Sequence, residues 1–291
     1  MPEPIKLIFL GTGSSVPTIK RNHPAILLIY KGEYILFDCG EGTQLQIQKA
    51  GLSPLKINKI FITHWHADHF SGLLPLIETM HLENRKKPLE IYGPDATRFV
   101  DSLIELSYWS IGFPLKVKDC KDNKILFSNN DYEIFCIKVK HNVPAYGYCF
   151  KEKDHWNIDI KKAHKFNLSQ KDLKEIKNKG IVRNVKLQQI AKKTEGRKIV
   201  YSGDTKETSA LFKVARNADV LIHDSTFIDN AGNKDHSCAI RVAQLAKKYN
   251  IKKLILTHFS KRYKTNKEIA DAVKPIFKNT IVAKDLMKVI I

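Results

Sequence analysis

The stretch His64-Trp65-His66-Ala67-Asp68-His69 decides how the rest of this 291-residue chain is interpreted. It follows a short β-branched run that ends at Thr63, and it precedes a segment of helically spaced leucines that starts at Phe70. In an extended segment the first two histidines point to the same side, so both imidazoles can reach one metal ion. Where the chain turns into the helix, the aspartate and the last histidine can face a second ion. Imidazole with carboxylate is a ligand set suited to zinc, whereas the alternative is a group of polar residues on an exposed loop.

Three more candidate ligands follow other predicted strands. They are His141 after a strand over 132–140, Asp204 after a strand over 198–202 and His258 after a strand over 254–257. A single histidine is more often a surface or core residue than a ligand, but these residues sit at strand ends, where the sites of α/β proteins collect. Asp204 is the natural bridge between two metals, because one carboxylate can offer an oxygen atom to each.

The remaining periodicities predict alternating strands and helices. In the first half, short strands are expected over 6–10, 25–30, 34–37, 59–63, 89–92 and 132–140, with a helix over about 70–83. In the second half, strands over 198–202, 220–223 and 254–257 alternate with helices over 237–249 and 266–277, the first of them capped by Ser237. This alternation in both halves favours an α/β layered fold.

The charge balance is strongly basic. Lysine and arginine total 49 against 30 aspartates and glutamates, which gives a formal net charge of +19. Such a balance favours a polyanionic partner, either nucleic acid or an anionic membrane surface. The alternative is a lysine-rich, solvated surface without a specific partner.

Much of this charge lies in one segment, residues 151–198. It holds 15 lysines and arginines against six acidic residues, and it contains one predicted helix over about 169–179. Its texture differs from the strand–helix alternation on either side. We therefore expect two halves of one domain, residues 1–150 and 199–291, with residues 151–198 as an inserted basic arm.

The cysteines and the apolar runs limit the class of protein. Five cysteines are scattered without a C-x-x-C pair, which indicates free thiols in a reducing compartment rather than a disulfide scaffold. No run approaches the ~18 apolar residues of a membrane span, and the first residues lack the layout of a signal peptide. We expect a cytoplasmic protein that does not bind a membrane.

The chain resembles the metallo-β-lactamase superfamily and, more narrowly, the ribonuclease Z family. The His-x-His-x-Asp-His motif alone indicates the superfamily. The narrower resemblance rests on four strings, LGTGS at 10–14, PTIKRN at 17–22, DCGEGTQ at 38–44 and THFSKRY at 257–263. The resemblance covers nearly the whole chain and implies a four-layer αββα sandwich.

The resemblance also implies the metal ligands and the reaction. One metal would be held by His64, His66, His141 and Asp204, and the other by Asp68, His69, Asp204 and His258. Two Zn²⁺ ions are expected per chain, although the same ligand types also bind Mn²⁺ or Fe²⁺. A hydroxide between the metals would attack the phosphorus and remove the 3′ trailer of a transfer RNA precursor, leaving a 3′-hydroxyl on the tRNA.

Three residues are predicted to move protons in this reaction. Asp68 would orient or deprotonate the nucleophile. Asp224 and His236 match late strings of the family, HDST at 223–226 and HSCA at 236–239, and would act together as an oriented acid. Asp224 stands where the family usually has Glu, and Cys238 stands where it has Thr. The alternative is a capping histidine and a turn aspartate.

The resemblance further implies contacts with RNA. In the family an arm inserted at this place clamps the body of tRNA, usually across a homodimer. Candidate contacts in the arm are Lys171, Lys174, Lys177 and Lys179, although the arm lacks the usual Gly-Pro-rich tip. Lys20, Arg21 and Arg262 are candidates near the cut, or they pair with core carboxylates instead. Four histidines without motif context are expected at the surface: His23, His81, His155 and His164.

Two other functions fit parts of this pattern. A small-molecule phosphodiesterase or related hydrolase on the same fold would use the ligand set but would not need the basic arm. An RNA-binding protein with a relict metal site would keep the arm, but it would not need a complete ligand set. Trailer cleavage uses all of these features.

Overall fold

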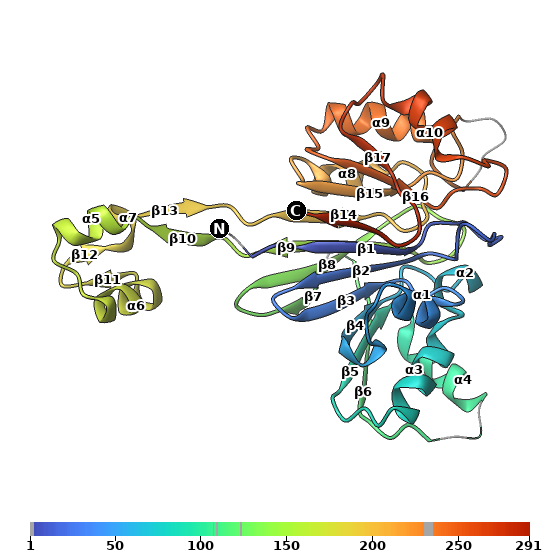
Figure 1. Cartoon of the computed structure of the whole chain (residues 1–291), viewed down its shortest axis with the longest axis horizontal. Coiled ribbons are helices and arrows are strands. Elements are labelled where there is room, and N and C mark those ends of the chain that lie inside the picture. The colour runs from blue at the N-terminus through green and yellow to red at the C-terminus, as the bar shows by residue number, and fades with distance from the viewer. Residues whose placement is uncertain (1–2, 107, 109, 123, 230–234) are drawn as a thin grey trace. The chain divides into compact units, whose positions relative to one another are not determined.

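The computed structural model describes residues 3–106, 108, 110–122, 124–229 and 235–291 (Figure 1). The chain divides into two compact units. The first comprises Met1–Phe127, Ile134–Phe150 and Lys198–Ile291, and the second comprises Ser128–Glu133 and Lys151–Arg197. All the candidate metal ligands belong to the first unit.

Two seven-stranded sheets run through the described residues. The first has the order β18 (Met287–Ile290), β1 (Lys6–Gly11), β2 (Ala25–Tyr30), β3 (Glu33–Phe37), β4 (Ile57–Phe61), β5 (Leu89–Gly93) and β6 (Leu115–Asp119). The second has the order β17 (Thr280–Val282), β16 (Leu254–Thr257), β15 (Val220–Asp224), β14 (Lys198–Tyr201), β9 (Tyr146–Glu152), β8 (Tyr132–Lys138) and β7 (Ile125–Ser128). Strands β3 to β6 and strands β14 to β17 are parallel, so the carboxyl ends of each set meet at one edge.

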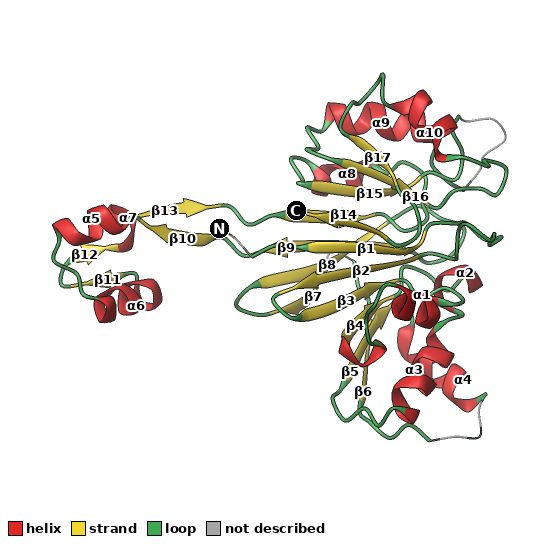
Figure 2. Cartoon of the chain, in the orientation of Figure 1, coloured by secondary structure: helices red, strands yellow, loops and turns green. Residues whose placement is uncertain are grey.

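Helices pack on the outer face of each sheet within the first unit (Figure 2). Strand β2 shows why, because all six of its residues are apolar and nearly all are buried, as expected for a strand covered on both faces. On the first sheet the helical segments are α1 (Thr43–Lys49), η1 (Pro54–Lys56), α2 (Ala67–Phe70), α3 (Leu73–Leu82) and α4 (Ala96–Glu105). On the second sheet they are α8 (Ser209–Ala215), α9 (Ala239–Lys248) and α10 (Asn266–Val273).

Aromatic rings fill the space between the two sheets. Phe37 of β3 stacks on Tyr148 of β9 with ring centroids 6.0 Å apart, and Phe61 of β4 meets the same tyrosine edge-on at 5.2 Å. Large buried rings of this kind contribute area and geometric specificity together. The predicted four-layer αββα sandwich is confirmed.

The helix predicted over 70–83 is divided into α2 and α3 at Gly72. The backbone N–H of Gly72 donates to Cys39 O at 2.9 Å, and a Cβ on Gly72 would lie 2.1 Å from Gly40 O. Only glycine permits this close approach of two backbones. The break docks the metal-binding motif against the loop that follows β3.

Ser237 does not cap the following helix, contrary to the sequence prediction. Helix α9 begins at Ala239 with Cys238 at the N-cap. The hydroxyl of Ser237 donates to Thr205 O at 2.6 Å and so fixes the loop that carries Asp204. A tertiary contact therefore takes the hydroxyl that the local pattern assigned to the helix.

The second unit has its own small core. Its elements are β10 (His155–Ile158), α5 (Ile160–Lys165), α6 (Gln170–Lys179), β11 (Ile181–Val182), β12 (Val185–Lys186), α7 (Leu187–Ile190) and β13 (Ala191–Thr194). Ser169 and Asp172 form a capping box at the start of α6. The buried apolar residues are Ala163, Leu168, Ile176, Val182, Val185, Leu187 and Ile190. This basic segment is thus a folded unit in the described structure.

Within the described residues, no helix has both the length and the apolar character needed to cross a bilayer.

Candidate metal centre

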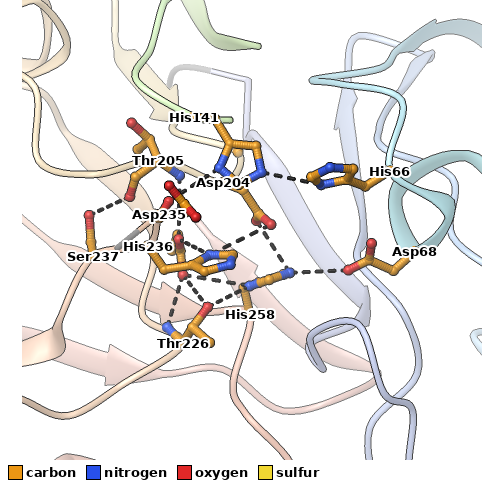
Figure 3. A network of polar contacts seen from close by, with 12 residues as sticks. His66, Asp68, His141, Asp204, Thr205, Thr226, Asp235, His236, Ser237 and His258 are labelled. Carbon is orange, nitrogen blue, oxygen red and sulfur yellow. Dashed lines mark hydrogen bonds and ion pairs between the residues drawn. The ribbon is translucent and has the colours of Figure 1, made fainter. Parts of the chain in front are cut away.

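The predicted ligands meet at the carboxyl ends of strands from both sheets. The His-x-His-x-Asp-His motif runs from the end of β4 into α2, His141 follows β8, Asp204 follows β14 and His258 follows β16. Parallel strands bring their carboxyl ends to one edge, which is why residues far apart in sequence converge here. Figure 3 shows several of these side chains pointing toward one another.

Three imidazoles form the first ligand group. Nε2 of His64 lies 3.0 Å from Nδ1 of His66, and Nε2 of His141 lies 3.2 Å from the same Nδ1 atom. Burial and the neighbouring imidazoles hold the pKa of His64 well below its usual value. Burial also lowers the pKa of His66 and of His141. Neutral imidazoles with converging nitrogens are what a metal ion needs.

Two histidines and two aspartates form the second group. Nε2 of His69 lies 3.6 Å from Oδ2 of Asp68 and 3.3 Å from Oδ2 of Asp204. Nε2 of His258 lies 3.4 Å from Oδ2 of Asp68 and 3.2 Å from Oδ1 of Asp204. All four side chains are buried. The two buried carboxylates, of Asp68 and Asp204, therefore require nearby positive charge.

These spacings fit metal ions. Ligand atoms placed tetrahedrally about 2.0–2.1 Å from one ion lie about 3.3–3.4 Å from one another, close to the separations in both groups. Oδ1 of Asp204 is buried and accepts no hydrogen bond from the described residues, which leaves its lone pairs for a cation. Oδ2 of the same carboxylate lies 3.9 Å from Nε2 of His64. The described residues therefore present His/Asp clusters consistent with a binuclear metal site.

Asp204 belongs to the second ligand group but not to the first, when a group contains only ligand atoms that all lie within 4.8 Å of one another. The first group contains the three histidines alone, while Asp204 appears with Asp68, His69 and His258, and again with Asp224 and His236. Its role as a bridge between two metals stays a prediction.

Asp38 orients one ligand and was not among the predicted site residues. It is fully buried at the end of β3, and its Oδ2 lies 2.8 Å from Nδ1 of His69. The hydroxyl of Tyr201 donates to the same oxygen at 2.8 Å, and the N–H of Thr63 donates to Oδ1 at 2.8 Å. With Nδ1 of His69 held by this carboxylate, the lone pair of Nε2 is free for a metal. The signal was present in the DCGEGTQ string, which begins with Asp38.

The other imidazoles are oriented in the same way. Nδ1 of His64 lies 3.0 Å from the hydroxyl of Thr63, Nδ1 of His258 lies 2.8 Å from the hydroxyl of Thr226, and Nδ1 of His141 lies 3.2 Å from the carbonyl of Asp235. His258 also adopts a left-handed backbone with φ of 62°. A histidine held in that conformation is strained, as at many functional sites.

The predicted acid pair lies beside the second ligand group. Nδ1 of His236 is 3.0 Å from Oδ2 of Asp224 and 3.8 Å from Oδ2 of Asp204. Burial acts to lower the pKa of His236, but the hydrogen bond and charge of Asp224 outweigh it and raise the pKa above its usual value. Asp224 is itself held by the N–H and hydroxyl of Thr226 at 2.8 and 2.7 Å. The shorter aspartate side chain thus still reaches the imidazole.

The predicted RNA contacts near the cut have different surroundings. Arg21 is buried and donates to the carbonyl of Tyr263 at 2.7 Å and to Oδ1 of Asn266 at 2.8 Å, so its guanidinium joins the amino-terminal loop to the carboxyl-terminal segment. Lys20 is exposed, and Arg262 is exposed and lies over the ring of Phe227. The four predicted arm lysines are exposed on α6.

His23 is not at the surface as predicted. His23 is only 8% exposed, because it packs against the loop that contains Gly40. A Cβ on Gly40 would lie 2.4 Å from the Cβ of His23. Local sequence context carries no information on such a contact between two loops.

Asp38→Asn should weaken metal binding by about 10–100-fold, because the amide cannot hold the Nδ1 proton of His69 as a carboxylate does. Asn tolerates the left-handed backbone of this position, where φ is 57°. Affinity is measured by competition with a chelator, and Asp101→Asn on the exposed side of α4 is the control. Unchanged affinity in the Asp38 variant would contradict the orienting role.

Known proteins resemble the chain over nearly its whole length. It is 41% identical over 278 residues to the ribonuclease Z of Thermococcus onnurineus, covering 92% of this chain and 89% of that one. It is 36% identical to the ribonuclease Z of Methanothermobacter thermautotrophicus, covering 98% and 96%. The family model described as "Anti-Pycsar protein Apyc1" matches residues 5–105.

Solved structures also resemble the chain over nearly its whole length. Human tRNase Z, short form, is 29% identical with a TM-score of 0.70 over 98% of both chains. The metallo-β-lactamase fold protein YhfI from Bacillus subtilis has a TM-score of 0.73 over 99% of both chains at 18% identity, which shows the fold alone. With its His/Asp clusters, the chain belongs to the ribonuclease Z family of metal-dependent endoribonucleases that process the 3′ end of tRNA, on a metallo-β-lactamase fold.

Proposed function

We propose that this chain removes the 3′ trailer of tRNA precursors with two Zn²⁺ ions and leaves a 3′-hydroxyl on the tRNA. The observation that carries the proposal is the pair of adjacent ligand groups beside the hydrogen-bonded Asp224 and His236. A tetrahedral spacing of imidazole and carboxylate ligands favours zinc over the octahedral oxygen sites of magnesium or manganese.

We assign one ion to each ligand group. His64, His66 and His141 would hold one ion, and Asp68, His69, Asp204 and His258 would hold the other. Asp204, whose Oδ2 lies 3.9 Å from Nε2 of His64, would complete the first set by bridging the two ions. When bound, two such cations supply hydroxide near neutral pH and stabilise both the attacking and the leaving oxygen.

Two side chains of the protein would accept and donate the protons of the reaction. Asp68 has two carboxylate oxygens, and we assign to it the orientation of the nucleophile and acceptance of its proton. The bond that breaks joins phosphorus to the ribose 3′ oxygen, so the phosphate leaves with the trailer. Because Asp224 occupies Nδ1 of His236, Nε2 is the nitrogen that can give a proton to the departing 3′ oxygen.

The inserted basic arm, residues 151–198, indicates a substrate that extends beyond the cleaved end. Residues 151–198 carry an excess of nine positive charges, and the exposed lysines of α6 include Lys171, Lys174, Lys177 and Lys179. Such a surface binds phosphates with little sequence preference. We propose that it grips the body of the tRNA, that the enzyme acts as a homodimer, and that it works in the cytoplasm, where its five free, buried cysteines stay reduced.

Asp68→Ala should reduce cleavage of a trailer-bearing precursor by about 10²–10³-fold or more, the loss expected when one group that stabilises the transition state is removed. Binding of the precursor should persist, because the basic unit is intact. The cut is mapped by primer extension with and without chelator, and binding is measured by filter retention. Full activity in the variant would contradict the metal assignment, and Asp101→Ala serves as the control.

His236→Ala should reveal its role through the leaving group. Cleavage of the precursor should fall about 10²–10⁴-fold, since the ribose 3′ oxygen leaves poorly without a proton. The fold-loss for hydrolysis of bis(p-nitrophenyl) phosphate should be at least ten times smaller, because p-nitrophenolate leaves without needing a proton. Equal losses on both substrates would assign the histidine to metal binding or packing instead.

Replacing the four α6 lysines named above with Ala should weaken precursor binding and flatten its salt dependence. Each lost phosphate contact lowers the slope of log affinity against log salt by about 0.7–0.9. The control replaces Lys247, Lys248, Lys274 and Lys278, four exposed lysines of the first unit, and so changes the net charge equally. Equal slopes in the two variants would show that net charge, rather than the arm, sets the affinity.

A further inference from the structure

A basic pocket lies at the end of the first sheet opposite to the metal centre. It is formed where three strands begin, since Tyr34 is the second residue of β3, Asn58 is the second residue of β4, and Lys87 lies two residues before β5. These strands are parallel, so their amino ends meet at one edge of the sheet, while the metal ligands follow carboxyl ends. From Asn58 to His64 the extended chain spans about 20 Å. The pocket is therefore separate from the metal centre.

Positive charge lines this pocket, whose volume is about 640 Å³. Its basic lining residues are Lys56, Arg85, Lys86 and Lys87, and no aspartate or glutamate of the described chain lines it. The three lysines are exposed and form no ion pair with any residue that the structure describes. Because four cations around one hollow repel one another, an anion between them would be stabilised.

Arg85 shows that this charge is built into the fold, because its residue is only 4% exposed. The guanidinium donates to the carbonyls of Leu55, Lys87 and Pro88 at 2.8, 2.7 and 2.7 Å. Burial lowers the pKa of Arg85, since all three acceptors are neutral. These carbonyls use only part of the N–H donors of a guanidinium. A buried cation whose partners are all neutral is further stabilised by an anion.

Neutral donors accompany the charges. Oδ1 of Asn58 accepts the backbone N–H of Tyr34 at 2.9 Å, which leaves the Nδ2 group as a donor. Asn84 is exposed in the pocket lining, and its side-chain amide has no hydrogen-bond partner among the described residues. Together the ammonium, guanidinium and amide donors outnumber what the two oxygens of a carboxylate can accept. The lining therefore favours a phosphate group, which has more oxygen acceptors and more charge.

We propose that this pocket binds a phosphate group, in addition to the phosphate on which the metal centre would act. Two sources carry this chemistry, a small free phosphate compound and the backbone of an RNA that extends past the metal centre. Binding in the pocket does not require cleavage of tRNA, so this proposal stands apart from the proposed function. The experiment separates the two sources.

The first test titrates inorganic phosphate into the full-length, zinc-loaded protein. With ¹⁵N-labelled asparagine, the side-chain amide signals of Asn58 and Asn84 report on the pocket by NMR, and Asn58→Ser and Asn84→Gly assign them. The metal centre also attracts phosphate, but it lies about 20 Å away along β4. We expect both amide signals to shift as phosphate binds.

A triple variant removes the exposed charges of the pocket, and a matched variant removes three exposed lysines that lie near the helices of the second sheet. The pocket variant carries Lys56→Ala, Lys86→Ala and Lys87→Ala, and the control carries Lys213→Ala, Lys247→Ala and Lys274→Ala. Phosphate affinity should fall about tenfold in the pocket variant, which is what three exposed ion pairs supply together, and should not change in the control. Thermal melting checks that both variants are folded. Unshifted amide signals in the wild type, or equal phosphate affinity in the two variants, would overturn the proposal.

The second test identifies the source of the phosphate. Binding of the trailer-bearing precursor is measured against salt for the same two variants. If the RNA backbone occupies the pocket, the slope of log affinity against log salt falls by about 0.7–0.9 per lost contact in the pocket variant alone. Equal slopes, beside the loss of phosphate affinity, assign the pocket to a free phosphate compound. Failure of the wild type to cleave the precursor would overturn the proposed function and leave the phosphate titration unaffected.

Discussion

The buried carboxylate of Asp38 is the interaction on which the rest of the metal centre depends. It lies at the end of a strand of the first sheet, contacts His69 of the motif, and accepts a hydrogen bond from Tyr201 of the second sheet. A charge this deep in the core is tolerated only when it is fully hydrogen-bonded and faces cations. One side chain thus couples the docking of the two sheets to the direction in which a ligand presents its nitrogen.

Contacts between loops also hold the ligand-bearing segments in place. Ser237 gives its hydroxyl to the Asp204 loop, and Gly72 allows the motif helix to lie against the turn after β3. Arg21 ties the amino-terminal loop to the segment just after His258. These contacts join segments far apart in sequence, so the ligand spacing is a property of the packed sandwich and not of any one segment.

Much of the fold and of the site could be predicted. The strand at 25–30 and the motif at 64–69 carry strong local signals, because side-chain period and ligand spacing are both fixed by neighbours in sequence. Asp38 was missed because a single aspartate after a strand has many possible roles. His23 was misplaced because its burial comes from a contact between loops, and the cap at Ser237 was wrong because a distant carbonyl took the hydroxyl.

The alternation of strands and helices, the kinds of ligand and the excess of positive charge in residues 151–198 could all be predicted, because residue type and spacing set them. Tertiary packing sets which nitrogen of His64, His69, His141 and His258 a neighbouring group holds. It also sets that Asp224 reaches His236 at 3.0 Å and that Trp65 and Phe99 stack on each other. Hydrogen-bond direction and ring stacking depend on atoms that come from segments far apart in the sequence, and no local pattern encodes the distances between such atoms.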